Sequence, residues 1–375
     1  MAHEIPDVTI VVTTYNHAHF LAAALESIKA QTVPLKEIIV VDDGSSDDPA
    51  KVVERFSGVK LLKQNNQGLS AARNTGLRAA HGSFVGFLDA DDRLLATMVE
   101  VNLRQFEHNP GCAFVYGAYQ LVDAKGNVTA KPPLCEPGDD AYSSFLVNNL
   151  VGMHGTVLYR REILLKEGGF DTTLRAVEDY DVYLRLARNY PVSAEDETLA
   201  SYFRHDSNMS NDNAFMLKWA LAVQGRHRET ASTRADWQEA FNLGQQGWKS
   251  YFISKQLGTL KFAAKRRNGL RAAVAGTAGI LRLEPGATFG EIRRWVRKRL
   301  PSGKSVRFGD LRRTTPIDEN FGYSRGKPLD RYYIERFLQE NAGDIRNRVL
   351  EIGDSAYTRQ FGGHRVTQAD VLNRY

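Results

Sequence analysis

Apolar runs alternate with amphipathic segments through the first third of the chain. Short runs rich in Val, Ile, Leu and Phe are typical of strands buried on both faces, as in a parallel sheet. The runs are Val8–Thr14, Glu37–Val41, Val59–Leu62 and Ser83–Leu88. Helices are predicted between them, at Phe20–Gln31, around Val52–Phe56 and at Leu69–Ala80. This repeated strand–helix order predicts an α/β fold whose mostly parallel sheet is flanked by helices.

The pattern changes twice further along the chain. From Cys112 to about Tyr202 it is mixed, with strands predicted at Ala113–Tyr116 and Gly155–Tyr159 and a helix at Val177–Asn189. Beyond residue 211 long helical stretches follow. A last unit contains a predicted helix at Tyr332–Glu340 and a strand at Arg348–Gly353. We therefore predict three parts, residues 1–210, 211–300 and 301–375.

Composition adds modest constraints. The 375 residues are 42% hydrophobic and 25% charged, which is typical of a globular protein. The net charge of +5 favours anionic partners. The two cysteines lack metal-site spacing, and we see neither a signal peptide nor an apolar run long enough to span a membrane. A cytoplasmic protein is expected.

Basic residues gather in the segment Lys261–Arg313. Three interpretations stay open: a solvated helix face, a patch that attracts anionic lipid at the inner face of the plasma membrane, and a nucleic-acid surface. No nucleic-acid recognition motif accompanies the charge, so no nucleic acid is expected as a partner. A homo-oligomer through the helical region is also conceivable. The cluster comprises Lys265, Arg266, Arg267, Arg271, Arg293, Arg294, Arg297, Lys298 and Arg299.

Polar clusters follow three of the predicted strands, at Thr13–Asn16, Asp42–Gly44 and Asp89–Asp92. Ligands of open α/β sheets bind beyond the carboxyl ends of the strands, so these clusters are candidates for one site. The third cluster has three carboxylates in four residues, and their repulsion is costly without a cation. Carboxylate oxygens suit Mn²⁺ or Mg²⁺, which also bind phosphate oxygens.

Five motifs in order give a more specific indication. They are Val8–Asn16, Val41–Ser45, Gly68–Gly76, Phe87–Asp92, and Gly168–Asp171 followed by Glu178-Asp179. Together they resemble the family 2 glycosyltransferases of the GT-A fold, over about residues 6–205. The resemblance implies an inverting enzyme that uses a nucleotide-diphosphate sugar.

The resemblance also implies roles for individual residues. Thr13, Tyr15, Asp43, Arg73 and Asp91 would bind the nucleotide, with Tyr15 stacking on a base that is usually uracil. The metal ligands would be Asp92 first, then Asp91 and Asp89. Asp179 would be the general base, with Glu178 as a rival or partner. Taken alone, the acidic pair is also what a helix N-terminus attracts.

One histidine is a candidate for the acceptor side. His154 precedes a predicted strand where family members place acceptor residues, and a structural histidine is an equal alternative. The expected acceptor is a hydroxyl of a glycan or a lipid-linked glycan in surface polysaccharide synthesis. Two other functions remain as alternatives: a nucleotidyltransferase and a non-catalytic module that binds nucleotide sugars.

The last 60 or so residues resemble a different family. Leu350–Asp354 is similar to the first strand and loop of a methyltransferase that uses S-adenosylmethionine. Val366–Val371 would be its second strand, with Asp370 near the ribose position. The loop lacks a second glycine and the rest of the sheet is missing, so an incomplete domain, and no methyl transfer, is expected.

Overall fold

The computed structural model describes residues 7–205, 208–266, 270–288, 290–291, 329–352 and 355–372. Contacts within the chain divide it into two units, residues 1–298 and 299–375. Sheet and helical region both belong to the first unit.

The first unit is built on one large sheet with the order β3-β2-β1-β4-β8-β6-β9-β5. Its first four strands in space are parallel, and they match the four predicted apolar runs. They are β1 (Val8–Thr14), β2 (Glu37–Asp42), β3 (Val59–Lys63) and β4 (Phe84–Asp89). The predicted α/β class and parallel core are confirmed.

The other half of the sheet mixes directions. Strand β8 is antiparallel to both β4 and β6, whereas β9 is parallel to β6 and antiparallel to β5. A short β7 pairs with β6. The bounds are β5 (Arg93–Leu94), β6 (Phe114–Val122), β7 (Val128–Ala130), β8 (Leu158–Arg160) and β9 (Val192–Phe203).

Two sequence predictions need correction here. The strand expected at Gly155–Tyr159 is shorter, because His154–Thr156 forms a 3-10 turn before β8. Strand β9 was not predicted, since Glu195, Asp196 and Glu197 interrupt its apolar pattern. It forms because it pairs along most of β6.

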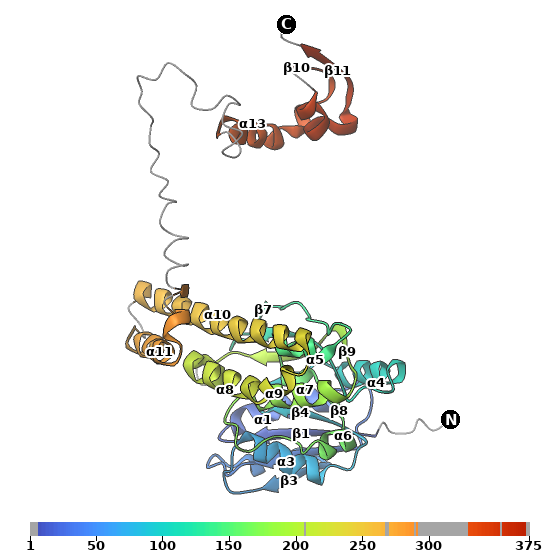
Figure 1. Cartoon of the computed structure of the whole chain (residues 1–375). Coiled ribbons are helices and arrows are strands. Elements are labelled where there is room, and N and C mark those ends of the chain that lie inside the picture. The colour runs from blue at the N-terminus through green and yellow to red at the C-terminus, as the bar shows by residue number, and fades with distance from the viewer. Residues whose placement is uncertain are drawn as a thin grey trace, which may run out of the picture. The chain divides into compact units, whose positions relative to one another are not determined.

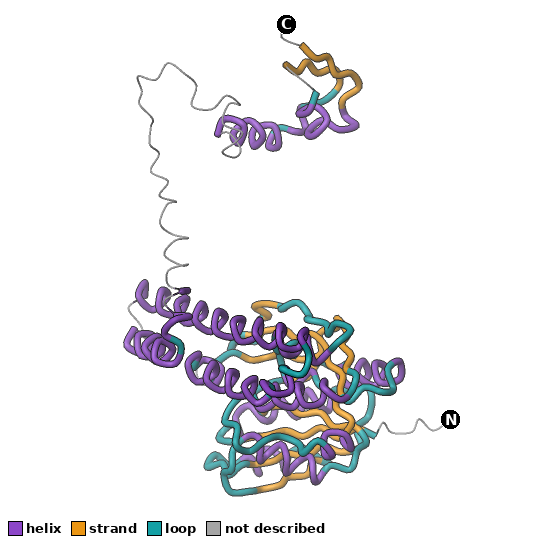
Figure 2. The backbone as a smooth tube through the Cα atoms, viewed as in Figure 1, coloured by secondary structure: helices purple, strands orange, loops and turns teal. Residues whose placement is uncertain are grey.

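Helices cover both faces of the sheet, as Figure 2 shows. Val8, Ile10 and Val12 of β1 share one core with residues of α1 (Ala18–Lys29), α2 (Pro49–Val53) and α4 (Met98–His108). Val11 points into the other core. Gly76 of α3 lies so close to Val11 that a Cβ at Gly76 would meet its Cγ1 at 2.3 Å. The helices of this second core are α3 (Leu69–Ala79), α5 (Ala141–Val147), α6 (Arg161–Lys166) and α7 (Glu178–Asn189).

The helical region packs directly against this second face (Figure 1). Gly244 fits only without a side chain, because a Cβ would lie 1.9 Å from the Leu146 carbonyl oxygen at the end of α5. Gln224 Nε2 donates to the same oxygen at 2.6 Å. The helices are α8 (Asn213–Arg226), α9 (Arg228–Ala231), α10 (Ala235–Arg266) and α11 (Leu270–Leu283). None of the helices described is both long and apolar enough to cross a membrane.

The predicted basic cluster lies outside the described side chains. Residues 267 and 292–299 are not described, and the side chains of Lys265, Arg266 and Arg271 are not described either.

The second unit contains α13 (Leu329–Glu340) and two parallel strands, β10 (Asn347–Ile352) and β11 (Val366–Leu372). Both strands match predicted positions. Asp370 lies opposite Leu350 in the ladder, and its carboxylate accepts a hydrogen bond from Arg348 at 2.7 Å. Gly353 and Asp354 lie outside the described residues, so the methyltransferase resemblance stays a prediction.

Candidate active site

A cavity of about 1220 Å³ opens in the first unit, beside the carboxyl ends of β1 and β4. The strand register explains why the three polar clusters meet there: Thr13 lies opposite Asp89, and Thr14 lies opposite Asp42. The predicted convergence of the clusters is confirmed. Strand-end residues that line the cavity are Thr13, Thr14, Tyr15, Asp43, Asp89, Ala90, Asp91 and Asp92.

Asp43 is fixed by the loop that precedes α3. Its Oδ1 accepts hydrogen bonds from Gln64 Nε2 at 2.7 Å and the Gln67 amide at 2.9 Å. Its Oδ2 accepts from the Gly68 amide at 2.8 Å. A carboxylate has about four acceptor positions, so one remains for a ligand. Tyr15 lines the cavity and is 48% exposed, so its ring is accessible to a base that stacks on it.

Arg73 occupies the centre of the acidic residues. Its buried guanidinium donates from Nη1 to Glu178 and from Nη2 to Asp89 Oδ1 at 3.0 Å. Thr13 Oγ1 donates to the same oxygen at 3.0 Å. Burial opposes the charge of Arg73, but the carboxylates of Asp89 and Glu178 outweigh it and raise its pKa. Asp89 thus shares the single positive charge of Arg73 with Glu178.

Asp91 and Asp92 carry the remaining negative charge of the motif. Asp91 Oδ2 lies 2.9 Å from Nε2 of His205, a residue just after β9. Asp92 is buried, and its Oδ1 accepts from the Phe203 amide at 3.0 Å. Burial, followed by the charges of Asp91 and Asp89, raises the pKa of Asp92 well above its usual range. Three carboxylates this close together, of which Asp92 has no cationic partner among the described residues, fit a cation.

The described residues do not by themselves form a group of three or more acidic, His or Cys ligands for a metal ion. Mg²⁺ and similar ions are commonly held by one or two carboxylates together with substrate phosphates. The residues therefore fit a cation that a diphosphate helps to bind.

Glu178 and Asp179 begin α7 and both line the cavity, but their partners differ. Glu178 is buried and paired with Arg73. Asp179 accepts a hydrogen bond from the Tyr180 amide at 2.8 Å. Burial, with the nearby charge of Glu178, raises the pKa of Asp179 to about 7. A general base works best with a pKa near the working pH, and Asp179 meets that condition.

The residue before this pair is strained. Val177 has a φ of 54°, in the left-handed region that a β-branched residue rarely adopts. It also lines the cavity. Strained backbone of this kind is concentrated at functional sites, where the surrounding structure holds it in place.

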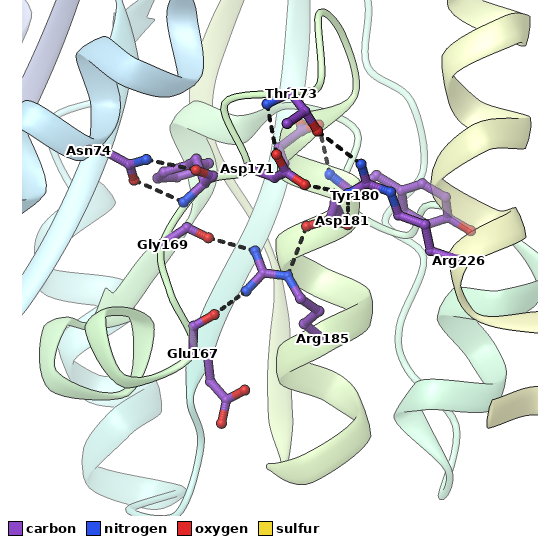
Figure 3. A network of polar contacts seen from close by, with 11 residues as sticks. Asn74, Glu167, Gly169, Asp171, Thr173, Tyr180, Asp181, Arg185 and Arg226 are labelled. Atoms are coloured by element: carbon purple, nitrogen blue, oxygen red, sulfur yellow. Dashed lines mark hydrogen bonds and ion pairs between the residues drawn. The ribbon is translucent and has the colours of Figure 1, made fainter. Parts of the chain in front are cut away.

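A polar network joins the loop that precedes α7 to α7 itself and to α8, as Figure 3 shows. Arg185 of α7 donates to the carbonyl oxygens of Glu167 and Gly169 and, at 2.8 Å, to Asp181 Oδ2. Arg226 of α8 donates to Asp171 at 2.6 Å and approaches Asp181 Oδ1 at 3.4 Å.

The same loop is also tied to α3. Asn74 donates to the Phe170 carbonyl at 2.6 Å and accepts from the Phe170 amide at 2.9 Å. The glycine-rich motif that resembles the family pattern thus anchors the start of α7 to two other helices.

His154 lines the cavity but is deeply embedded. It is buried among Phe87, Phe170 and Tyr183, and its Nε2 lies 3.1 Å from the Tyr159 hydroxyl. Burial lowers its pKa well below the usual range, so the ring is neutral. Its Nδ1 has no hydrogen-bond partner among the described residues.

Comparison with known proteins matches a family to part of the first unit. The sequence pattern described as Glycosyl transferase family 2 matches residues 9–167. The Escherichia coli protein WfgD, which is named as a UDP-Glc:alpha-D-GlcNAc-diphosphoundecaprenol beta-1,3-glucosyltransferase, is 31% identical over 50% of this chain and 72% of its own. The chain belongs to glycosyl transferase family 2.

Other relatives agree with this assignment. An uncharacterised glycosyltransferase of Haemophilus influenzae is 29% identical over 68% of this chain and 92% of its own. The chain spans between 30% and 63% of the length of four other curated relatives. The protein is a glycosyltransferase, and some relatives contain further regions.

A solved structure shares the fold of this glycosyltransferase. It is the mannosyltransferase PcManGT of Pyrobaculum calidifontis, solved with GDP-Man and Mn²⁺. The TM-score is 0.53 at 19% identity, over 79% of this chain and 87% of that one. The predicted GT-A architecture is confirmed.

Sequence reasoning missed several residues at the site of this glycosyltransferase. His205 and Arg204 follow a strand that was not predicted, and α10 brings Leu243, Tyr251 and Lys255 to the cavity. Three of the missed residues, Leu243, Tyr251 and Lys255, are spaced by multiples of four, which places them on one helix face. That spacing is a sequence signal that these residues share a helix face, but it does not reveal that this face of α10 lines the cavity.

Proposed function

We propose that the protein is an inverting glycosyltransferase that moves a sugar from a nucleotide-diphosphate sugar to a hydroxyl of a glycan or glycolipid. The observation that supports it most directly is the set of residues that line the cavity. Donor-side carboxylates and a carboxyl group with a pKa of about 7 line the same space. A hydroxyl placed at Asp179 could lose its proton while it attacks the anomeric carbon, which inverts the configuration.

The donor is proposed to be a UDP-sugar. Asp43 retains one acceptor position suited to a base N–H, and Tyr15 offers an exposed ring beside it. Thr13 and Arg73 support the site indirectly, because both hydrogen bond to Asp89. A relative named for a UDP-Glc donor supports the choice of uracil.

Mn²⁺ or Mg²⁺ is proposed as the cofactor. When bound, it would stabilise the departing nucleoside diphosphate as a Lewis acid. The resemblance implied the order Asp92, Asp91, Asp89 for the ligands. Geometry favours Asp91, which pairs with a potential ligand in His205, over Asp89, whose carboxylate oxygens already accept from Arg73. We propose Asp91 with His205 as the first ligands and Asp92 as support.

Asp179 is proposed as the general base, and Glu178 as a positioning residue. Glu178 is held by Arg73, so its carboxylate is not available to a substrate hydroxyl. Its charge nevertheless raises the pKa of Asp179. The acidic pair therefore divides into a base and a group that tunes the base.

The test is release of UDP from a panel of UDP-sugars with Mn²⁺, with Mg²⁺ and with chelator. We expect Mn²⁺-dependent UDP binding and slow metal-dependent UDP release. Absence of both, for every sugar nucleotide tried, would overturn the proposal. Binding without any release or transfer, with all tested acceptors, would favour the alternative of a non-catalytic module.

A nucleotidyltransferase would instead release inorganic pyrophosphate from UTP and a sugar phosphate. Family membership argues for transfer of the sugar, and pyrophosphate release would contradict it. We also propose that the acceptor is presented at the inner face of the plasma membrane, because glycolipid acceptors reside there.

A further inference from the structure

Arg226 is the last residue of α8, and its guanidinium reaches the loop that precedes α7 (Figure 3). Its Nη1 donates to Asp171 Oδ2 at 2.6 Å, and its Nη2 donates to Thr173 Oγ1 at 3.1 Å. The same Nη1 lies 3.4 Å from Asp181 Oδ1, in the first turn of α7. One arginine thus contacts the chain on both sides of the strained Val177.

The turn that carries Asp179 has little support of its own. Val177 is the N-cap residue of α7, has a φ of 54° and gives the helix no side-chain cap hydrogen bond. Three acidic residues follow in the first turn, Glu178, Asp179 and Asp181. Acidic side chains suit a helix N-terminus, but like charges this close repel each other. The local sequence therefore adds strain and repulsion at the position of Asp179.

The end of α8, by contrast, is firmly anchored on both sides of Arg226. Gln224 is fully buried, and its Nε2 donates to the Leu146 carbonyl oxygen of α5 at 2.6 Å. His227 is also buried, and its Nδ1 lies 2.9 Å from the hydroxyl of Tyr142 in the same helix. The backbone of Arg226 is a fixed point outside α7, from which its side chain holds the loop.

Arg185 makes similar contacts but cannot serve as such a fixed point. It joins the loop to the buried carboxylate of Asp181, yet it belongs to α7 and moves with that helix. Arg226 comes from a different helix, and it lies outside the residues that match the family, 9–167. It is therefore a link between the helical region and the turn that carries Asp179.

We propose that Arg226 is a positioning residue for the catalytic base. It holds the loop 171–177 and the first turn of α7 so that the Asp179 carboxylate faces the reacting hydroxyl. The inference rests on the proposed function, since it requires Asp179 to be the base. Neither Arg226 nor its partners Asp171, Thr173 and Asp181 line the cavity, so the effect on transfer is indirect.

The first test compares Arg226→Gln with the wild type in Mn²⁺-dependent release of UDP to water. It uses the UDP-sugar of the panel that is hydrolysed fastest, and Asp179 takes the proton of the water. We expect kcat to fall about tenfold or more, because a displacement of about 1 Å costs about 10²-fold. KM and the Kd of UDP with Mn²⁺ should stay within about twofold. An unchanged kcat, or an equal loss of UDP affinity, would overturn the proposal.

Arg234 provides a matched control. Its side chain is 49% exposed, compared with 40% for Arg226, and each of the two arginines pairs with two aspartates. The partners of Arg234 are Asp140 and Asp236, which belong neither to the loop 171–177 nor to α7. Arg234→Gln should keep kcat within about twofold. A similar loss of kcat in both variants would show that activity follows general stability, and would overturn the proposal.

A double-mutant cycle tests whether Arg226 acts through the loop. Asp171→Asn removes the charge of the partner that lies closest to Arg226. If both changes release the same loop, the double variant should lose clearly less kcat than the product of the two single losses. Single losses that multiply would show that Arg226 acts independently of Asp171, and the proposed route would be wrong.

The pH profile separates positioning from a direct effect of charge. The charges that act on Asp179 are those of Glu178, Arg73 and Asp89. Loss of a nearby cation would raise the pKa of Asp179, whereas access of water would lower it, because burial is the first cause of its raised pKa. We expect the acidic limb of Arg226→Gln to move to lower pH. A limb that stays or moves to higher pH would overturn the proposal.

Hydrogen exchange distinguishes failure of this inference from failure of the proposed function. The amides of Tyr180 and Asp181 should exchange faster in Arg226→Gln than in the wild type, and should be unchanged in Arg234→Gln. A wild type that neither binds UDP with Mn²⁺ nor releases it overturns the proposed function, and faster exchange then shows a structural brace only. UDP release by the wild type, with unchanged kcat and exchange in Arg226→Gln, overturns the positioning role alone.

Discussion

The two ends of the cavity differ in how their charges are compensated. At the donor end, Asp43 accepts three protein hydrogen bonds, Asp89 is paired with Arg73, and Asp91 lies against His205. At the α10 end, apolar side chains are exposed, and Arg204 and Lys255 have no carboxylate partner among the described residues.

The difference shows which end of the cavity has its polar groups fixed before a ligand binds. A charged donor needs fixed groups, because a preorganised polar site does not have to reorient during reaction. Asp179 lines the same cavity as the residues of both ends.

The largest effect should come from the group that joins the two ends. We expect Asp179→Asn to lower kcat about 10³-fold, since general-base catalysis contributes about 10²–10⁴-fold. UDP binding with Mn²⁺ should change little, because Asp179 does not belong to the donor end. Steady-state kinetics and calorimetry measure the two quantities, with Asp196→Asn, an exposed acid of β9, as the control. Transfer that survives in Asp179→Asn would show that another group is the base.

The same variant provides a check on folding. The folded pKa of Asp179, about 7, lies above the unfolded value of about 3.9. The native state therefore binds the proton more tightly, and ionisation of this group costs stability as pH rises from about 4 to 7. Asp179→Asn removes that cost, so its melting temperature at pH 8 should equal or exceed that of the wild type. A marked decrease would show that lost activity reflects unfolding.

Next in size is the buried cation of the donor end. Removing one partner of a buried ion pair leaves an uncompensated charge and costs about 3–5 kcal/mol. Arg73→Met should lower the free energy of unfolding by about that amount, because Glu178 would lose its partner in a buried position. Urea denaturation measures it, and Arg78→Met, exposed on the same helix, should be nearly neutral.

Loss of a metal ligand should have a smaller and more selective effect. Asp91→Asn should weaken Mn²⁺-dependent UDP binding on the order of 100-fold, and His205→Gln by a similar factor. A greater loss in Asp92→Asn than in Asp91→Asn would restore the ligand order that the sequence resemblance implies.

Below pH 7, kcat/KM should depend on pH. Below pH 7 Asp179 becomes protonated and cannot accept the proton of the acceptor hydroxyl, so kcat/KM should fall about tenfold for each unit. Above pH 7 this limb should level off. The profile is measured with saturating Mn²⁺. Residual activity of Asp179→Asn should lack the acidic limb, and persistence of the limb would assign it to another group.

The smallest effect concerns the strained turn. Val177→Gly removes a left-handed β-branched residue, which costs about 1–3 kcal/mol, and adds the entropy of a glycine, about 0.5–1 kcal/mol. We expect a net stabilisation of about 1 kcal/mol together with a modest loss of kcat as Asp179 becomes less fixed. Val128→Gly, in an exposed strand without strain, should be destabilising.

Local sequence was sufficient for the donor end. Four apolar runs predicted the parallel strands, and the polar residues directly after them had to meet at one sheet edge. Motif resemblance then implied the family and named Asp43, Arg73 and Asp179. The strands and their meeting at one cavity are confirmed, because strand burial and strand ends are encoded by neighbouring residues, whereas the roles of the named residues stay predictions.

Only the tertiary structure decided the remaining features. In the fold, Glu178 accepts a hydrogen bond from Arg73, whereas Asp179 lines the cavity without such a bond to Arg73, although the two acidic residues are adjacent in sequence. It brought His205 to Asp91 and α10 to the cavity. A carboxylate's role depends on which distant charge lies within a few ångströms, and a helix face is defined by what packs on its other side. Neither property is contained in a local pattern, because both arise when segments more than a hundred residues apart are folded together.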